Sequence, residues 1–170
     1  MDRSIDGGNQ YPIVSICCTT YNHARFIRQC MDGFLQQKTN FPIEVLIHDD
    51  ASTDGTQDII REYEKKYPNI VKPIYQKENQ YSKGVKVSLV YNYSRARGKY
   101  IALCEGDDYW TDPYKLQKQV DFLESHPDYV MCSHRFNQYI QEKGFLEEEQ
   151  DKDFEGADYD LKNLIGGKWL

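Results

Sequence analysis

The chain has 170 residues, a length that suits one domain with a sizeable hydrophobic core. Its net charge is −6, which argues against a general nucleic-acid-binding protein, because such proteins present a basic face. The sequence contains no apolar run of about 18 residues, so we predict no membrane-spanning helix. Residues 1–11 lack the apolar centre of a signal peptide and predict a loose lead-in to a cytoplasmic protein.

From residue 12 onward, apolar runs typical of buried strands alternate with segments of helical periodicity. The strands are expected at 12–20, 43–50, 70–75, 99–106 and 129–140. The helices are expected at 21–39, from Asp54 or Thr56 to 67, at 85–97 and at 111–128. Asn22 and Thr111 are the expected N-caps of the first and last helices. The acidic, weakly periodic residues 143–160 predict a loop.

This alternation predicts an α/β fold with a mostly parallel central sheet and helices on both faces, in one domain spanning residues 1–170. Ligands of such sheets bind outside the carboxyl ends of the strands. Three predicted strand ends carry polar sequences, namely "CTTYN", "HDDASTDG" and "CEGDD". We therefore expect these three segments to meet in one crevice.

The segment "CEGDD" places three carboxylates, those of Glu105, Asp107 and Asp108, within four positions. Burying such groups without partners is costly, whereas Mg²⁺ or Mn²⁺ prefers oxygen ligands and often shares carboxylates with substrate phosphates. One interpretation is therefore a divalent-metal site. The alternative is a solvated acidic turn before the next helix.

The other two strand ends carry groups suited to a nucleotide. Asp49 or Asp50 could accept a hydrogen bond from a nucleobase N–H or a ribose hydroxyl, and the alternative is an Asx turn, which we expect for Asp54. Tyr21 could stack on a base or pack as an ordinary aromatic side chain. Neither GxGxxG nor GxxxxGK[ST] occurs, so a metal is the natural means of holding a diphosphate here.

Three segments taken together resemble family 2 glycosyltransferases of the GT-A fold, whose nucleotide-binding half is Rossmann-like. They are "VSICCTTYNHARFIRQCMDGFLQQ", "IEVLIHDDASTDGTQDIIREY" and "ARGKYIALCEGDDYWTDPYKLQKQVDFLE", and the resemblance covers about residues 12–136. It implies an enzyme that transfers a sugar, with inversion, from a UDP-linked donor to a glycan or lipid-linked acceptor, assisted by Mn²⁺ or Mg²⁺. It also allows peripheral association with the inner face of the membrane.

The resemblance also implies roles for particular residues. Thr19 and Tyr21 match the segment that lines the nucleobase pocket, and Asp50 matches the aspartate that hydrogen-bonds the base. The metal motif is matched by Glu105, Asp107 and Asp108, of which Asp107 and Asp108 are the better ligand candidates and Asp107 also approaches the donor. A basic residue near the diphosphate is matched by Lys83 or Lys86.

The catalytic base of the family lies downstream of the metal motif, and no acidic residue at 147–160 stands in a motif that matches it. We therefore leave the base unassigned and expect residues 143–170 to form an incomplete acceptor-side region, with the chain truncated before the acceptor half. A catalytically silent module that binds nucleotide sugars is the first alternative. A phosphoacceptor receiver domain is the second, and "CTTYN" disfavours it because a receiver needs an acidic pair at the end of its first strand.

Overall fold

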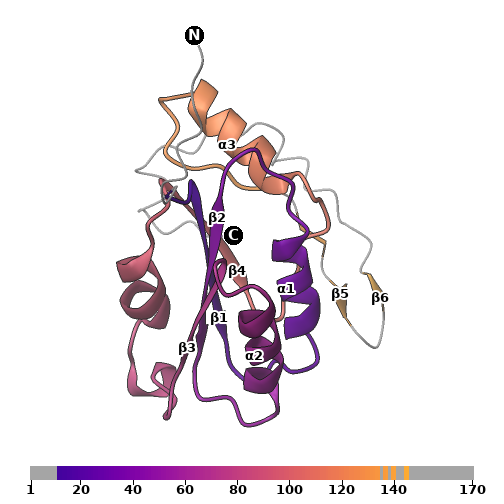
Figure 1. Cartoon of the computed structure of the whole chain (residues 1–170), viewed down its shortest axis with the longest axis vertical. Coiled ribbons are helices and arrows are strands. Elements are labelled where there is room, and N and C mark those ends of the chain that lie inside the picture. Colours follow the sequence, from indigo (N-terminus) through magenta and orange to yellow (C-terminus); the bar gives the residue numbers. More distant parts are fainter. Residues whose placement is uncertain (1–10, 135, 138, 141–143, 146–170) are drawn as a thin grey trace. The chain divides into compact units, whose positions relative to one another are not determined.

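A computed structural model describes residues 11–134, 136, 137, 139, 140, 144 and 145 of the chain (Figure 1). The chain divides into two compact units, Met1–Met131 and Cys132–Leu170. The described part of the second unit contains a short antiparallel pair, β5 (Tyr139–Ile140) and β6 (Gly144–Phe145). Every predicted site residue belongs to the first unit.

The first unit is built on a four-stranded parallel sheet with the strand order β3-β2-β1-β4. Its strands are β1 (Val14–Thr20), β2 (Ile43–Asp49), β3 (Val71–Tyr75) and β4 (Tyr100–Glu105). The two central strands, β1 and β2, are buried along almost their whole length, which is why their sequences are nearly continuous apolar runs. The four strands confirm the predicted parallel α/β fold.

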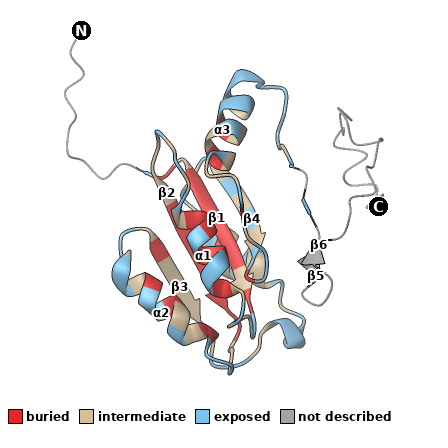
Figure 2. Ribbon diagram, turned by 90° about the vertical axis from the view of Figure 1, so that its right-hand side faces the viewer, coloured by how far each residue is buried: buried red, intermediate tan, exposed pale blue. Residues whose placement is uncertain are grey.

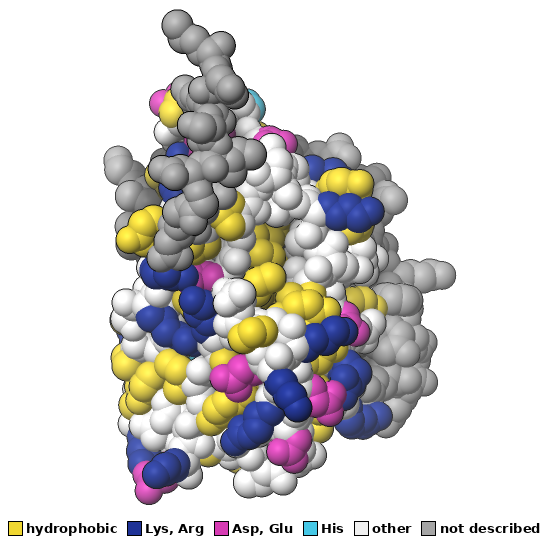
Figure 3. Space-filling model, viewed as in Figure 1, with side chains coloured by type: hydrophobic (Ala, Val, Ile, Leu, Met, Phe, Trp, Pro, Cys, Tyr) yellow, Lys and Arg dark blue, Asp and Glu magenta, His cyan; other side chains and the backbone are white. Residues whose placement is uncertain are grey.

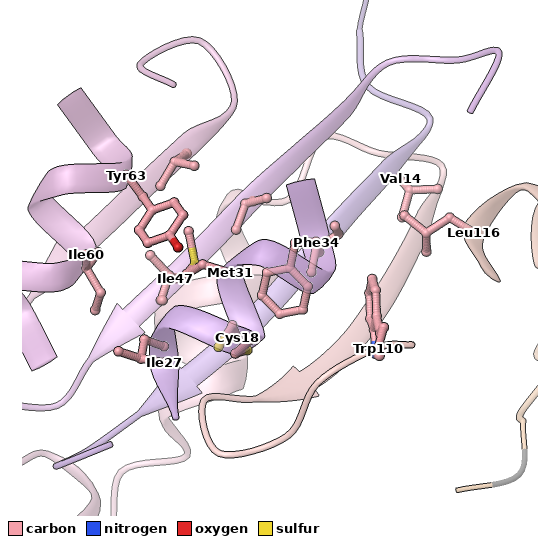
Figure 4. Packing of buried hydrophobic residues seen from close by; sticks show 14 of the residues in the cluster. Val14, Cys18, Ile27, Met31, Phe34, Ile47, Ile60, Tyr63, Trp110 and Leu116 are labelled. Atoms are coloured by element: carbon pink, nitrogen blue, oxygen red, sulfur yellow. The ribbon is translucent and has the colours of Figure 1, made fainter. Parts of the chain in front are cut away.

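Three helices flank the sheet: α1 (Ile27–Leu35), α2 (Thr56–Lys66) and α3 (Lys115–Ser125). Helices α1 and α2 cover one face, and Figure 2 shows the buried residues concentrated on β1 and on the helix faces that meet the sheet. The core between them joins residues of all three helices, and Figure 4 shows Phe34 of α1 facing Trp110, with ring centroids 4.9 Å apart. Burial of this helix face stabilises the packing of the helices on the sheet.

The opposite face of the sheet is covered by residues 81–95 (Figure 1). They form short turns, η1 (Tyr81–Lys83), η2 (Ser88–Asn92) and η3 (Tyr93–Arg95), of which η2 is a π-helical turn. The prediction of a regular helix at 85–97 is therefore wrong. The reason is a set of tertiary hydrogen bonds. The buried side-chain amide of Asn92 donates to the Cys18 carbonyl, and the Arg95 guanidinium donates to the Ile47 carbonyl. The conformation of the segment therefore follows the strands beneath it.

Three further predictions differ from the structure. Helix α1 begins at Ile27 after Phe26, not at Asn22, whose φ of 56° is left-handed. Helix α3 begins after Tyr114 rather than at Thr111. The strand predicted at 129–140 is wrong for its described residues 129–134, 136 and 137, which form no strand. The predicted loop at 143–160 lies outside the described residues except for 144 and 145, which belong to β6.

Basic and acidic side chains lie side by side on the face shown in Figure 3. One ion pair of the protein surface joins Arg28 to Glu62 at 2.8 Å, and both side chains are more than half exposed. In the part of the chain that the structure describes, no helix combines the length and the apolar character needed to cross a bilayer.

Candidate functional site

The carboxyl ends of β1, β2 and β4 are aligned by the register of the sheet, because Thr20 lies beside Asp49 and Thr19 lies beside Glu105. Backbone hydrogen bonds continue beyond the strands: the Gly106 amide donates to the Thr19 carbonyl at 2.9 Å. The Asp50 amide likewise donates to the Thr20 carbonyl at 2.9 Å. The three polar loops expected to meet do so at this edge of the sheet.

The loop after β1 is locked to the loop after β2 by side-chain hydrogen bonds. The Asn22 side chain accepts from the Thr53 amide at 2.8 Å, and the Asn22 amide donates to Ser52 Oγ at 2.8 Å. Asp54 accepts from the Ala24 amide at 2.9 Å and from the amide and hydroxyl of Thr56, which confirms the turn expected at Asp54. These two loops therefore act as one rigid wall of the site.

Backbone strain is present in the same two loops. Asn22 and Ala51 have φ values of 56° and 67°, and among the described residues they are the non-glycine residues in the left-handed region. Such conformations cost about 1–3 kcal/mol each and persist where the surrounding structure enforces them, which occurs often at functional sites.

Asp50, the predicted partner of the nucleobase, is buried and already engaged. Its Oδ1 accepts from the Gln80 amide at 2.7 Å and its Oδ2 accepts from the Tyr81 amide at 2.9 Å. These bonds fasten the loop at 76–84 over the end of β2. Because a carboxylate oxygen accepts two hydrogen bonds, each oxygen of Asp50 keeps capacity for a ligand N–H.

Asp49 is fully buried and only half satisfied. Its Oδ1 accepts from the Ser52 amide and from Gln57 Nε2, at 3.0 and 2.6 Å, whereas Oδ2 has no partner among the described residues. The neighbouring His48 is also buried, stacks on Tyr91 with ring centroids 4.7 Å apart, and is a packed strand histidine whose pKa is lowered by burial. Asp49 therefore has one carboxylate oxygen without a hydrogen-bond partner among the described residues, at the C-terminal end of β2.

Asp107 and Asp108 extend from the tight turn after β4, in which the Asp108 amide donates to the Glu105 carbonyl. Both aspartates are exposed at the surface. Partial burial and the neighbouring Asp107 carboxylate raise the pKa of Asp108 above its ordinary value, although His23 opposes the shift. A cation bound between the two carboxylates would relieve this repulsion.

The oxygen donors of this pair fit Mg²⁺ or Mn²⁺ by their chemistry. The described residues contain no group of three or more His, Cys, Asp or Glu side chains placed to hold a metal, so Glu105, Asp107 and Asp108 do not form a closed three-residue cage. An ion held here would draw its other ligands from a phosphate group and water, as Mg²⁺ does at phosphate sites.

The loop that carries the two aspartates is supported by direct hydrogen bonds from the residues that follow α1. Gln36 donates to the Trp110 carbonyl at 2.9 Å, and Gln37 donates to the Asp112 carbonyl at 2.9 Å. Gly33 allows this approach, because a Cβ at that position would lie 3.0 Å from the Trp110 nitrogen. Residues in and directly after α1 thus fix the path of the loop.

Gly106 separates β4 from Asp107 and is packed against the end of β1. A Cβ there would lie 2.5 Å from Thr20 Oγ1 and 3.0 Å from His23 Nδ1. Those two polar atoms are buried and have no hydrogen-bond partner among the described residues. Two orphaned polar atoms therefore border the residue that precedes the acidic pair.

The remaining predicted site residues have different environments. Thr19 is half-buried and Tyr21 is exposed beside it, so Tyr21 is not a packed aromatic. Lys83 is exposed and forms an ion pair with Glu78. The exposed Lys86 lines a hollow of about 650 Å³ along residues 81–93.

His23 and the backbone amides of residues 80 and 81 were not predicted from the sequence, and Thr20 was given no role there. His23 follows Tyr21 and Asn22 directly in the sequence, and its position in the loop after β1 was the one available signal. The bonds from residues 80 and 81 to Asp50 are made by the backbone, which carries no residue-type signal.

Comparison with known proteins adds a family. Residues 15–165 match the family described as Glycosyl transferase family 2. An uncharacterized protein of Mycobacterium tuberculosis is 50% identical over 121 residues, which make up 71% of this chain and 34% of that protein. The Escherichia coli UDP-Glc:alpha-D-GlcNAc-diphosphoundecaprenol beta-1,3-glucosyltransferase WfaP is 34% identical over 134 residues, 79% of this chain and 49% of WfaP. The matched part of this chain thus spans between about a third and a half of these relatives.

Two solved structures share the fold. The Staphylococcus aureus TarS fragment 1–349 in complex with UDP has a TM-score of 0.55 and 27% identity, covering 67% of this chain and 32% of that one. The mannosyltransferase PcManGT from Pyrobaculum calidifontis, in complex with GDP-Man and Mn²⁺, has a TM-score of 0.57 and 26% identity, covering 66% and 32%.

Proposed function

The chain belongs to glycosyl transferase family 2, and from that membership we propose that its C-terminal sheet edge binds the nucleotide-diphospho-sugar donor of a glycosyl transfer. The observation that carries the proposal is the placement of the Asp107–Asp108 pair in the loop after β4, fastened through Gly106 to the end of β1. The pair thus borders the same edge as Asp50 and Tyr21.

UDP is the nucleotide we propose, because WfaP is named for a UDP-Glc donor and the TarS fragment was solved with UDP. In this proposal Asp50 accepts the base N–H through its remaining lone pairs, and the exposed ring of Tyr21 stacks on the base. Thr19 lies between them and the acidic loop. Lys83 or Lys86 contacts the diphosphate, and Lys83 must exchange its pairing with Glu78 to do so.

Asp107 and Asp108 would hold a divalent ion, as their oxygen chemistry and mutual repulsion favour; Glu105 is the weaker candidate. When bound, such an ion would neutralise the charge that develops on the leaving diphosphate. The protein's own contribution is to fix the backbone that carries both carboxylates, through the tight turn after Glu105 and through the hydrogen bond from Gln36 to the Trp110 carbonyl.

The reaction we propose inverts the anomeric centre and uses a glycan or lipid-linked acceptor, the latter by likeness to WfaP, whose name gives a diphosphoundecaprenol acceptor. Inversion requires a base to deprotonate the acceptor hydroxyl, a contribution of about 10²–10⁴-fold. We assign no residue to that role.

Calorimetric titration of the 170-residue chain with UDP, in the presence and absence of Mn²⁺, tests the donor site. We expect Mn²⁺ to tighten UDP binding at least about tenfold, or about 1.4 kcal/mol. Asp107→Asn and Asp108→Asn should each remove that gain. Asp58→Asn, which changes an exposed aspartate on α2, is the matched control and should retain it.

Equal UDP affinity with and without Mn²⁺ in the unmodified chain would refute the metal role. Affinity with Mn²⁺ but no sugar transfer to a lipid-linked acceptor would instead identify a donor-binding module that is silent in catalysis.

A further inference from the structure

His23 is held at the entrance to α1 by its own backbone. Its carbonyl accepts hydrogen bonds from the Phe26 and Ile27 amides, at 2.9 and 2.8 Å, and these bonds form the first turn before the helix. Its ring stands edge-on to Phe26, with centroids 6.4 Å apart, and only 24% of the side chain is exposed. The imidazole therefore has little freedom to move.

The inner ring nitrogen of His23 faces the acidic loop. Nδ1 is buried without a hydrogen-bond partner among the described residues, and it lies 3.8 Å from Asp107 Oδ1. That distance is too long for a hydrogen bond. The Asp107 side chain is 46% exposed, so a change in its side-chain torsions can close the gap while the ring stays in place.

Gly106 sets how closely the ring and the acidic loop approach. A side chain at position 106 would lie 3.0 Å from His23 Nδ1 and 2.5 Å from Thr20 Oγ1. Thr20 is 3% exposed, and its hydroxyl also lacks a partner among the described residues. The chain thus keeps two buried polar atoms unpaired beside the residue that leads into Asp107, an arrangement that costs free energy unless a bound state satisfies them.

We propose that His23 is a positioning residue for Asp107, an inference that rests on the proposed donor site. In the tautomer with the proton on Nδ1, the ring donates a hydrogen bond to Asp107 Oδ1 when the aspartate turns to hold the divalent ion. The bond satisfies the buried N–H and leaves Oδ2 directed at the ion. Partners that orient metal-binding carboxylates in this way typically contribute about 10–100-fold to metal affinity.

A purely structural histidine would fill the same space between Phe26 and Gly106 without any effect specific to metal. The two roles separate on substitution. Asparagine carries an N–H donor close to the position of Nδ1, whereas leucine and alanine carry none. A role in packing alone favours leucine over asparagine, and a role in positioning favours asparagine over leucine.

The test is the affinity of the UDP-loaded 170-residue chain for Mn²⁺, followed by electron paramagnetic resonance of the free ion and by calorimetry. We expect His23→Ala and His23→Leu to weaken Mn²⁺ binding about 10–100-fold and His23→Asn to recover most of it. UDP affinity without metal should be unchanged in all three. His126→Ala, a histidine at the end of α3, serves as the matched control and should bind Mn²⁺ normally.

The proposal is overturned if His23→Leu binds Mn²⁺ as tightly as the unmodified chain, or if His23→Asn loses as much affinity as His23→Leu. If His23→Ala does not fold, the comparison of leucine with asparagine still decides between the two roles. Absence of Mn²⁺ binding by the unmodified chain is a separate result, which would refute the metal role proposed for Asp107 and Asp108.

Discussion

Substituting Gly106 by alanine tests whether the contact between β1 and the acidic loop sets the donor site. The new Cβ would lie 2.5 Å from Thr20 Oγ1 and 2.6 Å from Thr20 Cβ, distances that real Cβ contacts do not show. The loop must therefore move away from β1 and carry Asp107 and Asp108 with it. Overpacking of this kind costs about 1–3 kcal/mol of folding free energy. We expect the melting temperature to fall by roughly 2–12 °C and the Mn²⁺-dependent gain in UDP affinity to be lost.

Gly98→Ala is the matched control, because it introduces the same steric conflict at the other end of β1. Its Cβ would lie 2.5 Å from the Ser15 nitrogen, a backbone atom that cannot rotate away. Gly98→Ala should therefore destabilise the fold at least as much, yet the folded protein should bind UDP and Mn²⁺ normally. Calorimetry below both melting temperatures makes the comparison. Normal Mn²⁺-dependent binding by Gly106→Ala, or equal losses in both variants, would refute the steric explanation.

Two further predictions concern buried carboxylates. Burial alone would raise the pKa of Glu44, but hydrogen bonds from Ser15 and Arg97 outweigh it and lower that pKa below 4.5. Glu44→Ala should therefore lower the free energy of unfolding in urea by about 1–3 kcal/mol above pH 4.5. The difference between the two proteins should shrink as the pH falls through the folded-state pKa of Glu44. A difference that grows in acid would contradict this explanation. Asp50→Ala should speed amide hydrogen exchange at residues 80 and 81 at least about tenfold, whereas unchanged exchange would show that Asp50 does not hold the loop.

The two central strands, β1 and β2, could be predicted from the sequence because they are buried on both faces. A parallel strand buried on both faces, such as β1, is mostly apolar, so its position is visible in the composition alone. The acidic motif after β4 was also visible in the sequence, because three carboxylates follow directly on an apolar run. Features that depend on side-chain type, such as buried strands and clusters of carboxylates, can therefore be predicted from the sequence.

The elements that the sequence mispredicted depend on contacts between distant residues. The segment at 88–95 has helical periodicity, but the side chains of Asn92 and Arg95 donate hydrogen bonds to carbonyls of β1 and β2. The segment forms a π-helical turn followed by a 3-10 turn in place of a regular α-helix. Asn22 has the side chain of an N-cap, but its hydrogen bonds go to the loop after β2. Local propensity is a weak signal where tertiary hydrogen bonds are available.

The two ends of the sheet differ in how completely their buried polar groups are satisfied. At the N-terminal end, the buried Glu44 carboxylate accepts from the Ser15 hydroxyl and from both the amide and the guanidinium of Arg97. At the C-terminal end, Asp49 Oδ2, Thr20 Oγ1 and His23 Nδ1 have no partner among the described residues. Each such atom costs about 1–3 kcal/mol, and native folds keep few of them. Atoms without a hydrogen-bond partner among the described residues therefore lie at the same end of the sheet as the proposed donor site, and they include uncharged groups as well as a carboxylate.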